Sequence, residues 1–175
     1  MNIANILTIL RISLVPFFIH SLLTSKNQLT TPLIFFSICM VSDALDGFFA
    51  RKLKLKNPIG TYLDPIADKI LILSSFFVLA YLNLIPIWLF LIILGKDTII
   101  ITGWLLIYIL TGTYNISVTL LGKISIIFQM LTIFVTLLEL KNIQWIFYAT
   151  TIITVITLVD YCIKGTKKIT STYSK

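Results

Sequence analysis

Six long apolar segments, separated by short polar connections, dominate this sequence of 175 residues. A helix that crosses the hydrocarbon core of a bilayer needs about 20 mostly apolar residues. The segments that meet this requirement are Ile3–Leu23, Pro32–Ala50, Tyr62–Leu82, Pro86–Leu110, Val118–Leu138 and Ile143–Ile163. The chain is 58% hydrophobic and only 12% charged, unlike an ordinary soluble domain. We therefore predict an all-α polytopic membrane protein, with six transmembrane helices that run antiparallel to their neighbours and form one domain over residues 1–175.

The basic residues gather on one side of this predicted bundle. They follow the second segment, open the fifth and follow the sixth: Arg51, Lys52, Lys54, Lys56, Lys123, Lys164, Lys167, Lys168 and Lys175. Because positive charge marks cytoplasmic loops, we expect both termini and the hairpin after the second segment to face the cytoplasm. The net charge of +7 then suits anionic lipid headgroups rather than nucleic acid, since the charges lie between apolar runs. The first apolar run is too long for a cleavable signal peptide, so we expect it to stay as a helix.

Four of the seven acidic residues lie in the stretch Val41–Lys69. These four are Asp43, Asp46, Asp64 and Asp68. The first two are i,i+3 neighbours and the last two are i,i+4 neighbours, so each pair lies on one face of its helix. The polar hairpin Lys52–Ile59 would fold the two helices together and bring the pairs close. Four converging carboxylates form a site for divalent cations such as Mg²⁺. Each would cost roughly 2.5–3.5 kcal/mol at the bilayer centre, which makes an accidental cluster a poor explanation.

Asp64 has a second interpretation. If the third helix begins near Thr61, Pro65 is tolerable in its first turn, where N–H groups have no intrahelical partner. The alternative is that Asp64 is itself an N-cap residue and precedes Pro65 at the first helical position. This interpretation accounts for Asp64 alone, because it gives no reason for Asp68 one turn further on.

The acidic stretch resembles the signature of the CDP-alcohol phosphatidyltransferases. It reads Asp43-x-x-Asp46-Gly47-x-x-Ala50-Arg51, then eight residues, then Gly60-x-x-x-Asp64-x-x-x-Asp68, which fills all eight signature positions. The resemblance implies a membrane enzyme that transfers a phosphatidyl group from a CDP-linked lipid to an alcohol and releases CMP. It implies two divalent ions, Mg²⁺ or Mn²⁺, held by Asp43, Asp46 and Asp64. Asp68 would share a metal ion and act as the general base toward the acceptor hydroxyl. A homodimer is also implied.

Small and basic residues around the carboxylates are candidates for binding the CDP-lipid. Gly47 and Gly60 lack a Cβ, and Ala50 is small, so the two helices or the cytidine can approach the backbone closely. Close helix packing alone is an alternative reason for these residues. Arg51 suits a phosphate of the nucleotide, although it also fits an anchor on the cytoplasmic side.

An anionic acceptor such as glycerol 3-phosphate needs cations near the site, and Lys69, Lys96 and Lys123 are the candidates. We favour Lys123, which we expect at the cytoplasmic mouth. The segment Leu121-Gly122-Lys123-Ile124 is similar to one in phosphatidylglycerophosphate synthases, although those continue with Lys-Thr where this chain has Ser125-Ile126. Lys96 stands where the family usually has Arg. We expect Lys96 and Asp97 to serve different neighbours, because adjacent residues on a helix do not face each other.

Three further polar positions open the first segment. Asn5, Thr8 and Arg11 form a pattern that resembles the opening of the glycerophosphate-type members of the family. The alternative is that the small polar residues form hydrogen bonds between helices while Arg11 extends to the membrane surface. Cys39 and Cys162 lie in apolar surroundings, and we interpret them as small buried hydrophobic residues.

The leading hypothesis is an enzyme of the cell (inner) membrane, with its site facing the cytoplasm, that makes phosphatidylglycerophosphate from CDP-diacylglycerol and glycerol 3-phosphate. A cardiolipin synthase using CDP-diacylglycerol and phosphatidylglycerol is an alternative, since the stretches SDALDG and GTYLDPIADK are also similar to those enzymes. A cation channel or transporter would spread acidic residues across the membrane depth, whereas here they gather at one end. A non-catalytic scaffold does not account for the intact signature.

Overall fold

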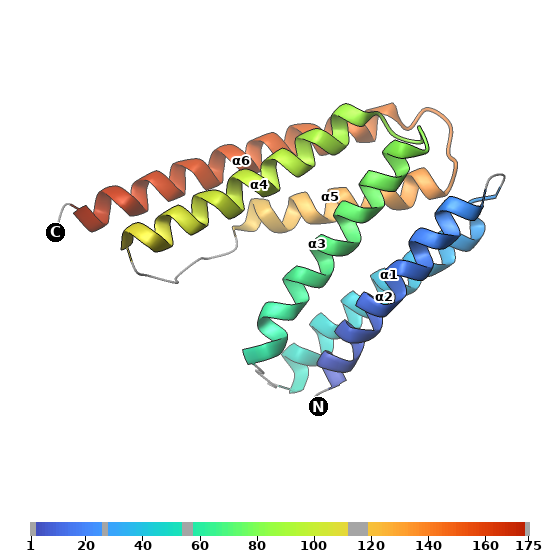
Figure 1. Ribbon diagram of the computed structural model, residues 1–175, viewed down its shortest axis with the longest axis horizontal. Coiled ribbons are helices and arrows are strands. Elements are labelled where there is room, and N and C mark those ends of the chain that lie inside the picture. Colours follow the sequence, from blue (N-terminus) through green and yellow to red (C-terminus); the bar gives the residue numbers. More distant parts are fainter. Residues whose placement is uncertain (1–2, 26–27, 54–57, 112–118, 174–175) are drawn as a thin grey trace. The chain divides into compact units, whose positions relative to one another are not determined.

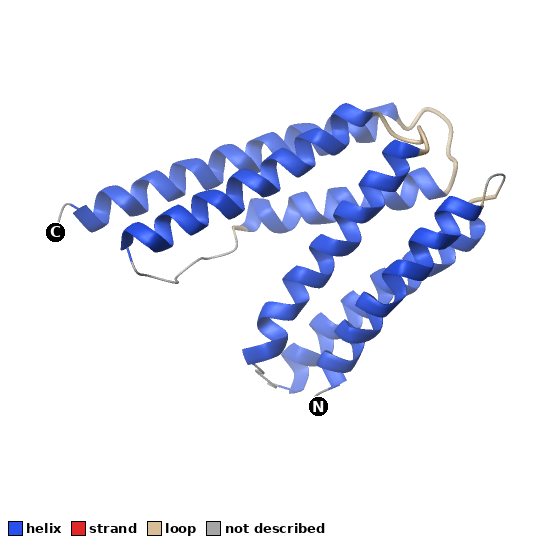
Figure 2. Cartoon of the chain, in the orientation of Figure 1, coloured by secondary structure: helices blue, strands red, loops and turns tan. Residues whose placement is uncertain are grey.

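The computed structural model describes residues 3–25, 28–53, 58–111 and 119–173. Over these ranges the chain forms α-helices joined by short connections and contains no strand (Figure 2). The six helices are α1 (Ile3–Thr24), α2 (Thr30–Leu53), α3 (Pro58–Tyr81), α4 (Ile87–Thr111), α5 (Leu120–Leu137) and α6 (Gln144–Tyr173). The predicted all-α class is confirmed.

The helix bounds follow the apolar segments closely except at the start of α3 and at the end of α6. Helix α6 continues to Tyr173, well beyond the predicted end at Ile163. A hydropathy pattern marks where a helix leaves apolar surroundings, but the backbone hydrogen bonds need not stop there. The continuing turns are polar, and Lys164 Nζ lies 2.7 Å from Asp160 Oδ2, a pair with the i,i+4 spacing that supports an exposed helix.

The start of α3 corrects two predictions. The helix begins at Pro58, where the missing N–H costs nothing because first-turn N–H groups have no intrahelical partner. Asp64 and Pro65 therefore lie inside the helix, and the N-cap interpretation of Asp64 is wrong. The predicted hairpin Lys52–Ile59 is also too long, since both of its ends belong to helices and residues 54–57 lie outside the described part.

The contacts divide the chain into two compact units, of which the first comprises Met1–Pro86 and Ile133–Lys141. Within it, α1 packs against both α2 and α3 (Figure 1). Large side chains that are fully buried form its core: Phe18, Leu22, Phe36, Leu71, Phe76 and Leu79. The rings of Phe18 and Phe36 lie 5.7 Å apart between centroids and join α1 to α2. The prediction of a single domain over residues 1–175 stays a prediction.

The second unit comprises Ile87–Thr132 and Asn142–Lys175. Helices α4 and α6 lie side by side in it (Figure 1). Hydroxyl groups connect α5 to α6: Thr132 Oγ1 and Thr150 Oγ1 lie 2.6 Å apart, and Thr157 Oγ1 donates to the Leu121 carbonyl at 3.2 Å. Because a bilayer core offers no water, such hydrogen bonds between helices satisfy polar side chains that would otherwise be costly there.

Three helices of the described part are long and apolar enough to cross a membrane, namely Ile87–Ile109, Leu120–Leu137 and Gln144–Lys167. Helices α1 and α2 contain shorter apolar stretches, Leu10–Thr24 and Thr30–Ser42, within the side chains that the structure describes. Many large apolar side chains point outward on these helices, as expected where the solvent is lipid. The structure therefore indicates a membrane protein.

Candidate active site

A buried arginine contacts one of the four predicted site carboxylates. Arg11 Nη1, on α1, lies 2.6 Å from Asp68 Oδ1 on α3. The Arg11 side chain is 0% exposed, whereas that of Asp68 is 20% exposed. Charge-assisted hydrogen bonds of this kind are shorter and stronger than neutral ones. The alternative in which Arg11 extends to the membrane surface is therefore wrong.

The helix register explains why Arg11 is buried. Arg11, Val15, Phe18 and Leu22 recur at intervals of four, three and four residues, and all four are buried. This spacing places them on one face of α1, which packs against the other helices of its unit. A charged group on such a face needs a partner, because burying an isolated charge is strongly unfavourable. Asp68 is that partner.

The other three carboxylates, Asp43, Asp46 and Asp64, have side chains outside the described part. Their backbone is helical, so each predicted pair does lie about one turn apart on a continuous helix, α2 or α3. Among the described side chains no group of three or more His, Cys, Asp or Glu residues occurs. The metal cluster therefore stays a prediction. The side chains of Gly47, Ala50, Arg51 and Gly60 fall in the same undescribed stretch.

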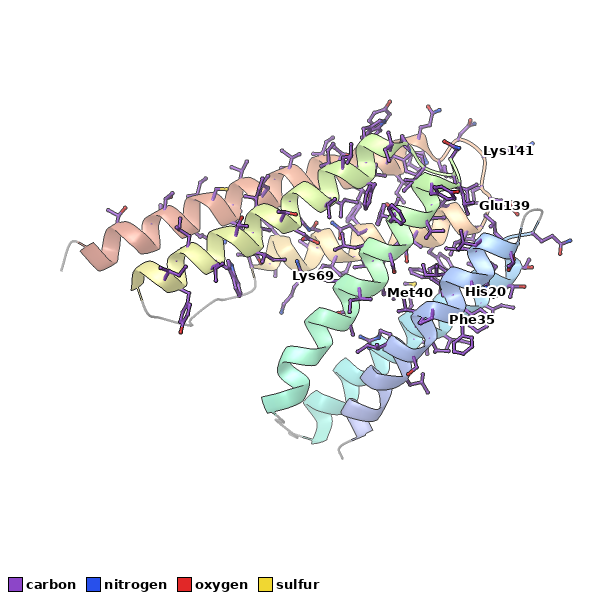
Figure 3. The ribbon with its side chains drawn as sticks, in the orientation of Figure 1. His20, Phe35, Met40, Lys69, Glu139 and Lys141 are labelled. Atoms are coloured by element: carbon purple, nitrogen blue, oxygen red, sulfur yellow. The ribbon has the colours of Figure 1, made fainter. Side chains whose placement is uncertain are left out.

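The three candidate acceptor-binding lysines are found in different units. Lys69 follows Asp68 and projects from near the middle of α3, half-buried (Figure 3). Lys123 is exposed in the first turn of α5, and Lys96 is buried within α4. Because Lys69 belongs to the first unit and the other two to the second, a shared acceptor site stays a prediction.

Lys96 and Asp97 contradict one expectation. They form an ion pair, with Nζ of Lys96 3.2 Å from Oδ1 of Asp97. Adjacent Cβ atoms on a helix diverge, but the four-carbon stem of lysine is long enough to bring its ammonium group back across one residue. The expectation that the two side chains do not face each other is therefore wrong.

Tyr161 is a neighbour of the Gly122-Lys123 segment that sequence reasoning missed. A Cβ at Gly122 would lie 2.8 Å from Tyr161 Oη, so only glycine fits without a shift. The backbone N–H of Thr119 donates to the same hydroxyl at 3.4 Å. The glycine in this segment was the available signal, since glycine inside a membrane helix often marks a close approach.

Comparison with known proteins agrees with the signature. The model of the CDP-alcohol phosphatidyltransferase family matches residues 1–158. This chain belongs to the CDP-alcohol phosphatidyltransferase family. It is therefore a phosphatidyltransferase, as the acidic signature predicted.

The sequence is similar to those of several curated proteins. The chain is 31% identical over 182 residues to a CDP-diacylglycerol–glycerol-3-phosphate 3-phosphatidyltransferase of Aquifex aeolicus, covering 97% of this chain and 98% of the relative. It is 31% identical over 151 residues to the protein of the same name from Bacillus subtilis, covering 79% and 77%. It is 35% identical over 103 residues to a CMP-forming cardiolipin synthase of Rattus norvegicus, covering 58% and 33%.

Proposed function

We propose that this enzyme transfers a phosphatidyl group from CDP-diacylglycerol to glycerol 3-phosphate, giving phosphatidylglycerophosphate and CMP. The observation that carries the proposal is the match to the Aquifex aeolicus enzyme, whose name states this reaction and which aligns over almost the whole of both chains. The cardiolipin synthase match covers a smaller share of each chain. It supports the second candidate, in which phosphatidylglycerol is the acceptor.

The reaction requires one proton transfer and one exchange of bonds at phosphorus. The acceptor hydroxyl oxygen bonds to the phosphorus of the phosphatidyl group, while the bond from that phosphorus to the bridging oxygen breaks. That oxygen leaves with CMP. The acceptor's proton passes to the Asp68 carboxylate, which is accessible in part and is held by Arg11 on the buried side. Positioning and charge neutralisation account for most of the catalysis in such transfers.

The four carboxylates of the signature are suitable ligands for Mg²⁺ or Mn²⁺. Asp43, Asp46 and Asp64 would hold two such ions, with Asp68 sharing one, because carboxylate oxygens are the ligands that these hard cations prefer. The support from the structure is the helical register of both aspartate pairs and the accessible carboxylate of Asp68. When bound, the ions would neutralise the charge of the diphosphate and of the transferred group.

The remaining contacts follow the signature. Gly47, Ala50, Arg51 and Gly60 would bind the CDP-lipid, and Lys123, with Lys96 and Lys69, would bind the acceptor phosphate. Arg51 and Lys123 are cationic partners of the type that phosphate groups require. Lys123 is exposed, as direct contact with a soluble acceptor demands.

We further propose that all six helices cross the cell membrane and that the site, both termini and the α2–α3 turn face the cytoplasm. The distribution of basic residues supports this orientation. A homodimer is part of the same proposal. The outward face of α4 carries exposed apolar side chains that suit lipid or a second copy: Ile99, Ile101, Leu105, Leu106 and Ile109.

The decisive experiment supplies purified protein with CDP-diacylglycerol, Mg²⁺ or Mn²⁺, and each acceptor in turn, and follows the release of CMP. Release that requires glycerol 3-phosphate supports the leading function. Release that requires phosphatidylglycerol rejects it in favour of cardiolipin synthesis. Without CMP from either acceptor, both functions are rejected.

A further inference from the structure

We propose that Arg11 is a positioning residue for Asp68: by holding Oδ1 of this carboxylate, it withholds that oxygen from metal ions and orients Asp68 as the base. The inference rests on the proposed function, because it assigns Arg11 a task in that reaction. It adds α1 to the two helices that carry the acidic signature.

The burial of the pair is asymmetric. The arginine side is fully closed, with Arg11 on the packed face of α1, whereas the Asp68 side chain keeps one-fifth of its surface exposed. The carboxylate can therefore contact Arg11 on its buried side and still reach substrate on its accessible side.

The pair also differs from the other ion pairs that the described side chains form with one another. Lys164–Asp160 joins residues one turn apart on α6, and Lys96–Asp97 joins neighbours on α4. Arg11–Asp68 connects two helices, across 57 positions of sequence. The orientation of Asp68 therefore depends on how α1 packs, and not only on the local geometry of α3.

Arginine suits this task better than lysine. Its guanidinium is planar and always charged, and it fixes the direction of a carboxylate that it contacts, whereas lysine supplies only a point charge. Its positive charge also reduces the attraction of the Asp68 carboxylate for cations. Asp68 would thereby be set apart from Asp43, Asp46 and Asp64, the other carboxylates of the signature.

The first test measures the binding of Mn²⁺ alone, by electron paramagnetic resonance, to purified protein without substrate. Arg11→Met removes the charge and releases Oδ1, so we expect Mn²⁺ to bind about tenfold more tightly. Phe18→Leu is the matched control, because it perturbs the same buried face of α1 without changing charge, and its Mn²⁺ affinity should equal that of the wild type. Equal or weaker Mn²⁺ binding by Arg11→Met would overturn the proposal.

The second test measures turnover. In Arg11→Met we expect kcat to fall at least a hundredfold with little change in KM for CDP-diacylglycerol, since the loss concerns the orientation of the base. The double variant Arg11→Met with Asp68→Asn should be no slower than Asp68→Asn alone, because both substitutions remove the same function, that of the oriented base. A kcat within twofold of the wild type for Arg11→Met, or losses that multiply in the double variant, would reject the role.

Two outcomes need a second measurement: an Arg11→Met protein that does not fold, and a wild type that is inactive. If Arg11→Met does not fold, Arg11→Lys replaces it: the charge remains but the fixed plane is lost, so kcat should fall about tenfold with unchanged Mn²⁺ affinity. A wild-type kcat in Arg11→Lys would then overturn the proposal. If wild-type protein releases no CMP with any acceptor, the proposed function fails, while tighter Mn²⁺ binding by Arg11→Met still supports the part of the proposal in which Arg11 withholds Oδ1 of Asp68 from metal ions.

Discussion

Lys96 and Asp97 are consecutive residues of α4, and their charged groups lie 3.2 Å apart at a point where each residue is only 6% exposed. A charge in such surroundings is tolerated only with a compensating group nearby. The pair therefore lets α4 carry two ionised side chains inside an otherwise apolar helix. Intramembrane charges of this kind usually serve function, which agrees with Lys96 as a candidate for the acceptor site.

We predict that Lys96→Met destabilises the protein by about 3 kcal/mol or more, because Asp97 stays buried and loses the ammonium group that lies 3.2 Å from it. The double variant Lys96→Met with Asp97→Leu should recover much of this loss, since it removes both charges together. Thermal unfolding in detergent measures the effect. Lys164→Met is the matched control: its pair with Asp160 is short, but the lysine is 55% exposed, so the change should stay below about 1 kcal/mol. Equal losses for the two lysine variants would contradict the prediction.

Gly122→Ala should destabilise the contact between α5 and α6 by roughly 1–3 kcal/mol, because its Cβ would overlap the Tyr161 hydroxyl. Adding Tyr161→Phe removes that hydroxyl and should restore part of the stability. Gly103→Ala on α4 is the control, since no atom lies within 4 Å of the added Cβ and alanine favours helix. Unfolding midpoints of the three variants provide the check, and a Gly122→Ala protein as stable as Gly103→Ala would show that Tyr161 moves aside freely.

The helices of this protein are predictable from its sequence because each contains a long apolar run bounded by polar residues, and such runs favour helices where water is absent. The position of Arg11 is different. Its spacing from Val15 and Phe18 predicts a shared face, but not whether that face meets lipid or protein. Its partner lies 57 positions away, on a helix whose orientation only packing determines.

The chemistry of single residues explains two other differences between the predicted and the observed structure. Pro58 could begin a helix or end one, and sequence reasoning placed it in the hairpin when it is the first residue of α3. Helix geometry fixes the direction of each Cβ and so predicts separate neighbours for Lys96 and Asp97, whereas the long lysine side chain turns back to its neighbour. The acidic signature predicted the family correctly, since it depends on residue identity and spacing rather than on three-dimensional contacts.

Removal of divalent ions should abolish turnover and lower stability. With chelator present we expect no CMP release. Added Mg²⁺ or Mn²⁺ should restore it, because the bound ions would again neutralise the negative charge of the diphosphate. The unfolding temperature should rise with Mg²⁺ concentration in the wild type, as binding to the folded state requires. Asp43→Asn weakens the proposed site, so its unfolding temperature should respond less, while Lys164→Met should respond like the wild type. Full turnover in chelator would reject the metal site.

Lys123→Ala should raise the KM for glycerol 3-phosphate about tenfold and leave kcat nearly unchanged, because a phosphate contact remote from the reacting hydroxyl contributes mainly to binding. The KM for CDP-diacylglycerol should not change. Lys141→Ala is the matched control, since Lys141 is also exposed but lies in the connection at the opposite end of α5. Neither variant should lose stability, so a kinetic difference between them reports on substrate binding. Were both variants to show the same KM as the wild type, Lys123 would be only a cytoplasmic anchor, and Lys69 and Lys96 would be left as the candidates for the acceptor phosphate.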